Sequence, residues 1–464
     1  MAVKMLMGLA IAPACLAVCS TAHAQTAAQR FASVVVAKDG SGTGSGSWIG
    51  YVAGGNSASG SNSAVAAGSG NVASALGAFV GAGTANSADG VSSLVIGGFD
   101  NHASAIDSLI GAGAGNRTKG PRAVVVGGGY NLASGPWSFI GGGGRETGSG
   151  SAGASAQDHV AAGKWSTIGG GMGNRAGANA SQTGSTVAGG EQNQAINTDA
   201  TVVGGKQNIA SATFATVAGG QGNTASGNGA SVGGGLGNTA SGVAATVPGG
   251  SSNVASGSYS VAVGQRAKAV NAGAFAFADG SAFDFSTSAS NEFAVRATGG
   301  VRFVSGLDAG GTPASGVTLA PGSGSWSSLS DRNAKKDFRD VDGDAILVKL
   351  ASMPIYTWRY KAEASGALHM GPTAQDFRAA FGLGDSDKRI ATIDAEGVAL
   401  AASQALHRQL KRQENALAEQ EHDLSELERR LAQLESFEQA RHRARSHDRA
   451  RQRSVRTTLV RAQR

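Results

Sequence analysis

The sequence predicts a mainly β protein that consists of a repetitive 15-residue β-roll or β-solenoid, a small α/β domain and a C-terminal coiled coil. Three observations predict this fold class. Asparagine recurs every 15 residues in two blocks between Asn56 and Asn253. Near Ser330 the composition changes from Gly, Ala, Ser, Val and Asn to a mixed, charged sequence. From Leu410 to Leu434, Leu and Gln recur at intervals of three and four residues, which is the spacing of a coiled coil.

Residues 1–24 have the pattern of a secretory signal peptide. Lys4 supplies the positive charge, residues 5–18 the apolar segment, and Ala22 and Ala24 an A-x-A cleavage site. Both cysteines precede that site, so we expect export to the periplasm, the cell surface or the exterior without disulfides. No later segment has 18 consecutive apolar residues, and no transmembrane segment is therefore expected in the mature chain.

After an N-terminal segment at residues 25–54, the repeats are expected to span residues 55–265. Val or Ile stands six residues before each repeating Asn except the first, and Gly stands three residues before it. A fixed period of this length is typical of stacked coils. The repeating residues are Asn56, Asn71, Asn86, Asn101, Asn116, Asn131, Asn174, Asn193, Asn208, Asn223, Asn238 and Asn253.

A 15-residue coil has room for two short strands and two turns. We expect the Val/Ile column to point inward, because β-branched side chains pack well on a pleated surface. The glycine suits a positive φ, and the asparagine can bond to its equivalent one coil away. One Val and a few Ala in each coil make a thin core, so a homotrimer that shares its core is expected to be more stable than a single chain.

Two stretches interrupt the period. The gap between Asn131 and Asn174 predicts an inserted loop that runs from Gly141 through His159. A shift of four residues separates Asn174 from Asn193. Insertions of this kind can bind a ligand or be neutral, and the sequence leaves both interpretations open.

The end of the repeats is similar to a known family. The pentad Ser260-Val-Ala-Val-Gly264, followed by Ala267-Lys-Ala269, resembles the S-V-A-[IV]-G and A-x-A-x-G elements of trimeric autotransporter adhesin heads. This resemblance implies a trimeric, adhesin-like fibre. The receptor or glycan that such a fibre would bind is not implied.

Residues 266–325 are expected to form the end or neck of the fibre, and residues 326–395 the small α/β domain. Strand-like pieces occur at residues 292–297 and 301–304. In the small domain the pattern predicts helices at 345–353 and 374–381 and strands at 355–360 and 390–393.

Ser330 lies five residues before Lys335, at the point where the composition changes. Serine and lysine can act as nucleophile and base without His or Asp. Lys335 must be neutral for this role, which burial or a nearby cation favours. Because a spacing of five puts the two side chains on opposite faces of a strand, a turn is required, and we expect the site to form only when the trimer does. The alternatives are a helix-capping serine followed by surface lysines, or Lys336 as the base.

Three motifs in this region resemble the intramolecular chaperone auto-processing domain of phage endosialidases and other tail spikes. They are Ser330-Asp-Arg-Asn-Ala-Lys335, Gly371-Pro-Thr-Ala-Gln-Asp376 and the helix entry Asp394-Ala-Glu-Gly-Val-Ala-Leu-Ala401. The resemblance implies that this domain drives trimerisation and then cleaves its own chain once at Ser330, with Lys335 as base. It implies no cofactor and no metal ion. The supporting motif residues are Asp331, Gly371, Gln375 and Asp376.

The coiled coil is expected at residues 396–440, with Gln413 and Gln420 fixing its register. A basic tail at 441–464 contains nine Arg and one Asp, and it is expected to be a disordered, solvated end or a contact for an anionic surface. The rest of the chain has a net charge of −2, so nucleic-acid binding by the body is not indicated. The expected seam residues are Leu410, Gln413, Leu417, Gln420, Leu424, Leu427, Leu431 and Leu434.

The function predicted from these features is an exported trimeric fibre matured by a self-cleaving chaperone. One alternative keeps the chaperone domain without proteolysis, as a trimerisation foot. Another is a glycan-binding or glycan-degrading tail spike. A degrading site needs a pair of carboxylates at a fixed separation, yet the repeats contain few acids and aromatic residues make up only 5% of the chain.

Overall fold

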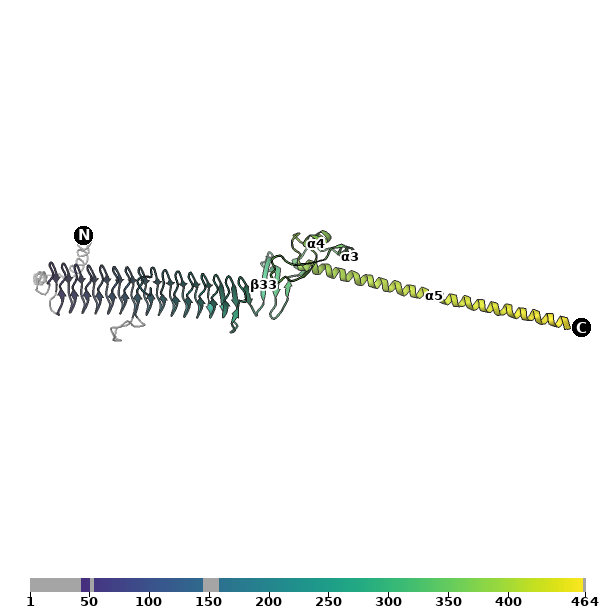
Figure 1. Cartoon of the computed structure of the whole chain (residues 1–464), viewed down its shortest axis with the longest axis horizontal. Helices are drawn as coiled ribbons and strands as arrows, with labels where there is room; N and C mark the ends of the chain where they lie inside the picture. Colours follow the sequence, from purple (N-terminus) through teal and green to yellow (C-terminus); the bar gives the residue numbers. More distant parts are fainter. Residues whose placement is uncertain (1–42, 51–53, 145–157, 462–464) are drawn as a thin grey trace. The chain divides into compact units, whose positions relative to one another are not determined.

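The structure is a computed structural model, and it describes residues 43–50, 54–144 and 158–461. The chain divides into a first unit that ends at Gly299 and a second unit that begins at Gly300 (Figure 1). The predicted signal peptide lies outside the described residues, as does most of the predicted N-terminal segment. Within the described part, no helix combines the length and the apolar character needed to span a membrane.

The first unit is a parallel β-solenoid of about 16 turns, as the 15-residue period predicts. Each turn contributes one short strand to each of two sheets. The 17-stranded sheet, here called the valine sheet, consists of β1 (Trp48–Ile49), β3 (Ala64–Val65), β5 (Phe79–Val80), β7 (Leu94–Val95), β9 (Leu109–Ile110), β11 (Val124–Val125), β13 (Phe139–Ile140), β15 (Thr167–Ile168), β17 (Thr186–Val187), β19 (Thr201–Val202), β21 (Thr216–Val217), β23 (Ser231–Val232), β25 (Thr246–Val247), β26 (Gly250–Ser251), β28 (Val261–Gln265), β30 (Phe275–Ala278) and β32 (Phe293–Arg296). The 15-stranded sheet, here called the alanine sheet, consists of β2 (Ser57–Ala58), β4 (Val72–Ala73), β6 (Ser87–Ala88), β8 (His102–Ala103), β10 (Arg117–Thr118), β12 (Leu132–Ala133), β14 (Val160–Ala161), β16 (Arg175–Ala176), β18 (Gln194–Ala195), β20 (Ile209–Ala210), β22 (Thr224–Ala225), β24 (Thr239–Ala240), β27 (Val254–Ala255), β29 (Ala267–Ala269) and β31 (Phe285–Ser286).

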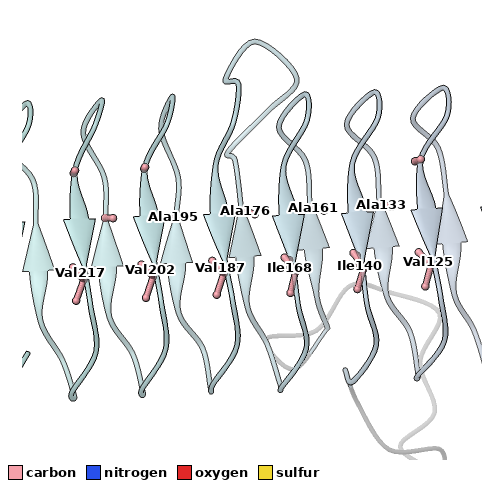
Figure 2. Close-up of a cluster of buried hydrophobic side chains, with 14 of the residues drawn as sticks. Val125, Ala133, Ile140, Ala161, Ile168, Ala176, Val187, Ala195, Val202 and Val217 are labelled. Atoms are coloured by element: carbon pink, nitrogen blue, oxygen red, sulfur yellow. The ribbon is translucent and has the colours of Figure 1, made fainter.

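The core of the solenoid lies between the two sheets. The Val/Ile column of the valine sheet is fully buried, as Val125, Val202 and Val217 illustrate, and it faces small residues such as Ala133 and Ala195 of the alanine sheet (Figure 2). The inward orientation predicted for this column is confirmed. Because one large and one small side chain meet in each coil, the two sheets can approach closely and leave a thin core.

A ladder of asparagine hydrogen bonds joins successive coils and is interrupted at Asn131, whose Oδ1 has no hydrogen-bond partner in the described structure. The backbone N–H of Asn86 donates to Oδ1 of Asn71 at 3.0 Å, and Nδ2 of Asn86 donates to the carbonyls of Ala82 (3.0 Å) and Gly98 (2.9 Å). Gly98 has a φ of 98°, and a Cβ there would collide with the carbonyl oxygen of Gly113. The predicted bond between equivalent asparagines and the predicted positive φ of the recurrent glycine are both confirmed.

The prediction that His159 belongs to an inserted loop is wrong. His159 occupies the asparagine position of a complete coil, and its strand β14 pairs with β12 and β16. The N–H of Asn174 donates to Nδ1 of His159 at 3.0 Å, which replaces the asparagine Oδ1 of other coils. Residues 145–157, the other part of the predicted insertion, lie outside the described residues.

The shift of four residues enlarges one turn, from Gly177 to Gly184, between β16 and β17 (Figure 2). This segment is here called the extended turn. Oε1 of Gln182 accepts hydrogen bonds from the N–H groups of Ala178 (2.5 Å) and Asn179 (3.0 Å). The extra residues are therefore tied to each other, and the register of the strands on either side is unchanged.

Stacking of coils continues past residue 265 to β32, which lies within the strand-like piece predicted at residues 292–297. The second unit begins with an antiparallel sheet of three strands. Its elements are β33 (Val301–Leu307), β34 (Pro313–Leu319), β35 (Trp326–Ser328), the 3₁₀ turn η1 (Arg332–Ala334), α3 (Gly343–Ser352), β36 (Tyr356–Trp358), β37 (His369–Gly371), α4 (Ala374–Phe381) and α5 (Thr392–Arg461).

The small domain has a core of few residues. Met353, Phe377 and Val398 are its buried apolar cluster, and Ile390 packs against them. The two helices predicted before residue 382 are confirmed, but the strand predicted at 390–393 is wrong. Ile390 packs into the core without pairing with a strand, and α5 begins at Thr392.

The C-terminal helix α5 is a single helix of 70 residues. The prediction that residues 441–464 form a disordered end is wrong, because the helix continues to Arg461. The segment contains no Gly or Pro, and Arg and Ala are strong helix formers. Among the predicted seam residues, Leu417, Leu424 and Leu431 are about 60% exposed (59%, 62% and 59%), so this stripe has no partner within one chain.

Candidate active site

Ser330 follows the last strand of the antiparallel sheet of the second unit along the chain. Strand β35 ends at Ser328, and the N–H of Leu329 still donates to the carbonyl of Gly316 at 2.9 Å. Asp331 then begins η1, where its Oδ1 accepts a hydrogen bond from the N–H of Asn333 at 2.9 Å. The chain therefore leaves the sheet and turns sharply at Ser330.

This turn brings Lys335 back to Ser330. Nζ of Lys335 donates a hydrogen bond to Oγ of Ser330 at 2.5 Å, and the N–H of Lys335 donates to the carbonyl of Arg332 at 3.1 Å. The two side chains thus lie within reach of each other through a turn. The capping role considered for Ser330 belongs to its neighbour Asp331.

Ser330 and Lys335 are both exposed in the single chain. Their contact forms without a partner chain, which differs from the expectation that the site assembles only in the trimer. The hydrogen bond to Ser330 comes from Lys335, and no bond between Lys336 and Ser330 occurs in the described part of the structure. The side chain of Arg332 lies over the ring of Phe338 at 5.0 Å, which places a further cation in the same turn.

The other motif residues organise the small domain. Gly371 ends β37, and Gln375 is an exposed residue of the first turn of α4. Asp376 pairs with the helix cap: its N–H donates to Oγ1 of Thr373 at 3.1 Å, and its Oδ2 accepts from that hydroxyl at 2.6 Å. Among the residues that the structure describes, these three form no hydrogen bond or ion pair with Ser330 or Lys335, and the contacts of Asp376 give it a structural role in the α4 cap.

The hairpin β36–β37 holds a polar aromatic cluster that the sequence analysis missed. The ring of His369 stacks on Trp358 at 4.7 Å and meets Tyr360 at 5.4 Å. Nε2 of His369 lies 2.9 Å from Oε2 of Glu363, and this hydrogen bond, together with one from Ser365, lowers the pKa of Glu363. The alternation of Trp358 and Tyr360, two positions apart in the strand predicted at residues 355–360, is the sequence signal that indicates such a cluster.

No group of three or more His, Cys, Asp or Glu side chains is positioned to hold a metal ion within residues 43–50, 54–144 and 158–461. The side chains that meet at Ser330 are a hydroxyl and an amine. A hydroxyl next to an amine can add to a carbonyl carbon once the amine takes its proton.

Comparison with known proteins places this site at the start of a recognised domain. Residues 330–382, which are 53 of the 464 residues, match the family Peptidase_S74, described as chaperone of endosialidase. No curated protein matched the chain. The protein thus combines a β-solenoid with a C-terminal segment similar to a chaperone of endosialidase, which confirms the second resemblance drawn from the sequence.

Proposed function

We propose that this chain forms an exported trimeric fibre whose second unit acts as an intramolecular chaperone for trimerisation and then cleaves the chain once at Ser330. The observation that carries this proposal is the 2.5 Å contact between Lys335 Nζ and Ser330 Oγ, at the first position of the segment that matches the chaperone family. Export rests on the signal peptide pattern in residues 1–24.

The outer face of the valine sheet supports a trimer. Residues on either side of the buried residues of each strand project outward, and in the described strands between Ala64 and Val295 the charged one among them is Asp279, which follows Ala278 at the end of β30. The corresponding outward residues of the alanine sheet include five charges. These are Asp89, Arg117, Lys119, Arg175 and Lys268. The valine sheet is therefore the face suited to contact other chains, and the alanine sheet is the face suited to solvent.

The second unit supports the same assembly. Its buried core contains little more than Met353, Phe377 and Val398, which is too small for a stable independent domain. Large apolar side chains such as Val348 (71% exposed) and Met370 (77% exposed) lie on its surface, together with the leucine stripe of α5. Packing three copies together would bury these side chains and draw the attached fibres into register.

Cleavage follows from the chemistry of the pair. Oγ of Ser330 adds to the carbonyl carbon of an adjoining peptide bond while Lys335 accepts the hydroxyl proton. The proton passes to the leaving amine, and water then hydrolyses the ester. Lys335 must be neutral at the start, and contact with partner chains would favour this by removing water from an amine that is exposed in the single chain. The trimer thereby makes cleavage conditional on assembly, although the contact itself forms earlier.

The test compares the full-length chain with Ser330→Ala, Lys335→Met and the matched control Lys336→Met. We expect the wild-type chain and Lys336→Met to yield two fragments with a new N-terminus at or next to Ser330. We expect Ser330→Ala and Lys335→Met to remain uncleaved and to assemble with the native mass of a trimer. Intact mass, N-terminal sequencing and native mass spectrometry provide the readouts. A wild-type trimer that stays intact would show that the domain is retained as a trimerisation foot.

A further inference from the structure

Two exposed tryptophans occupy the same turn of neighbouring coils. Trp137 and Trp165 precede β13 and β15, and their ring centroids lie 6.1 Å apart at an interplanar angle of 40°. They are 42% and 53% exposed, with φ values of 53° and 57°. A left-handed backbone is unfavourable for a bulky residue, and these rings fill no core. Their presence at this edge calls for a role outside packing.

Two cations lie near these rings. Nζ of Lys164 lies 4.0 Å from the centroid of Trp165 and 5.2 Å from that of Trp137. The guanidinium of Arg122 lies 5.3 Å from Trp137 and forms an ion pair with Asp107 at 3.4 Å. Lys164 forms no such pair with a carboxylate in the described residues. Trp137 therefore has two cations near its ring, and Trp165 is the second ring of this tilted pair.

The next coil presents no side chain at the position beside Trp165. The strand register Thr167–Thr186 places Gly184 beside Trp165, and the register Thr186–Thr201 places Asp199 beside Gly184. Gly184 has no side chain, and Asp199 is exposed with its carboxylate over Gly184, because a Cβ there would collide with Oδ1 of Asp199. The backbones of Trp165 and Asp199 are two coils apart, which is about 9–10 Å along the solenoid. A ring stacked on an indole needs a separation of about 3.5–4 Å from it.

The extended turn borders this space. The N–H of Lys164 donates to the carbonyl of Gln182 at 2.9 Å, and the N–H of Gly184 donates to the carbonyl of Lys164 at 3.0 Å. Oε1 of Gln182 is already occupied within the extended turn, which directs its amide nitrogen to other acceptors. The four-residue insertion thus adds an ordered polar wall at the coil where the two tryptophans end.

We propose that Trp165, Lys164, Gln182, Gly184 and Asp199 form a binding site, here called the Trp165 slot, for an uncharged pyranose residue of a glycan. The apolar C–H face of a pyranose ring stacks on the free face of the indole. Its hydroxyls donate to Asp199 and accept from Lys164 and Gln182. Since the slot contains one carboxylate and one ammonium group, it favours a ligand with both donors and acceptors over an acidic sugar. The site lies wholly in the solenoid and does not depend on cleavage at Ser330.

The test applies the full-length chain to a printed array of neutral and acidic glycans and measures the affinity for each neutral glycan that binds. Trp165→Ala and Asp199→Asn are expected to weaken that binding at least tenfold. Gly184→Asn is expected to do the same by filling the slot, and Asn is tolerated at this turn position because Asn62 occupies it with a φ of 55°. Binding should also change the tryptophan fluorescence of the wild-type chain but not of Trp165→Ala.

Phe214→Ala is the matched control. Phe214 occupies the same turn, is 60% exposed with a φ of 59°, and lies next to Gly229, but it has neither the lysine nor the carboxylate. We expect this variant to bind as the wild type does. The proposal is overturned if no neutral glycan binds, if acidic glycans alone bind, or if Phe214→Ala loses as much affinity as Trp165→Ala. A change in native mass on Trp165→Ala would also overturn it, because it would identify this edge as a contact between chains.

Discussion

Replacing Asn223 by alanine tests the asparagine ladder at the centre of a regular block. The side-chain amide Nδ2 donates to the carbonyls of Gly219 and Gly235, each at 2.9 Å, and Oδ1 accepts the N–H of Asn238 at 2.9 Å. The variant removes all three bonds. It leaves the Gly219 carbonyl and the Asn238 N–H without these partners, whereas the Gly235 carbonyl still accepts the N–H of Gln221 at 2.9 Å.

The size of the effect follows from the burial of those groups. The two carbonyls are partly accessible to water, so each loss costs about 1 kcal/mol, whereas the buried N–H of Asn238 costs about 2 kcal/mol. We therefore expect a local loss of about 3–5 kcal/mol in each chain. Because coils interact with their neighbours alone, this loss should be confined to the coils near Asn223.

Hydrogen exchange followed by mass spectrometry measures this local stability in the full-length chain. A loss of about 3 kcal/mol corresponds to roughly a hundredfold faster exchange of the amides in these coils. Gln221→Ala is the control, because Gln221 is an exposed residue two positions before Asn223, and its replacement should change the exchange rates little. Exchange in Asn223→Ala that matches both the wild type and Gln221→Ala would refute the assignment of the ladder as a main source of solenoid stability.

Three further predictions address other parts of the chain. Burial lowers the pKa of His159 below its ordinary value of 6.5, so the unfolded chain binds a proton more readily than the folded chain as the pH falls. The coil should therefore lose stability as the pH falls below 6.5. His159→Asn should remove this pH dependence in unfolding experiments between pH 7 and pH 5. Leu424→Asp should convert the trimer to monomer in native mass spectrometry, because it places three charges in the leucine seam, and an unchanged trimer would exclude α5 from the interface. Hydrogen bonds from Thr298 lower the pKa of Asp279, whose Oδ1 also accepts a hydrogen bond from Arg296 at 3.0 Å. The stability of the end of the solenoid should therefore be full above pH 4 and fall in stronger acid. Asp279→Asn should show a weaker pH dependence when hydrogen exchange of β32 is measured.

Much of the solenoid could be predicted because the same structural positions recur in every coil and require the same kinds of residue each time. The Val/Ile, Gly and Asn columns each meet a single requirement: burial, positive φ and bonding between coils. His159 escaped prediction since its Nδ1 supplies the same acceptor as asparagine through a different side chain. A pattern of letters does not register this chemical equivalence.

The candidate sites differ in how far they could be predicted. The spacing of Ser330 and Lys335 required a turn, and the short η1 provides it. The contact between Trp137 and Trp165 could not be predicted, because 28 residues separate them and the intervening insertion hides that they occupy adjacent coils. For the same reason, Gly184 has no meaning in the sequence until the register places it beside an exposed indole.

The uniform register of the solenoid has a consequence for how its length can vary. Asn208 and Asn223 bond the coils before and after them in the same way, so the removal of residues 209–223 would join two coils that already match. The rod would shorten by about 4.8 Å and keep every type of bond. Loss of 14 residues would leave one extra residue for a turn to accommodate, as the extended turn accommodates four without a change in strand register. Length in this protein is therefore a quantity that can change only in whole coils.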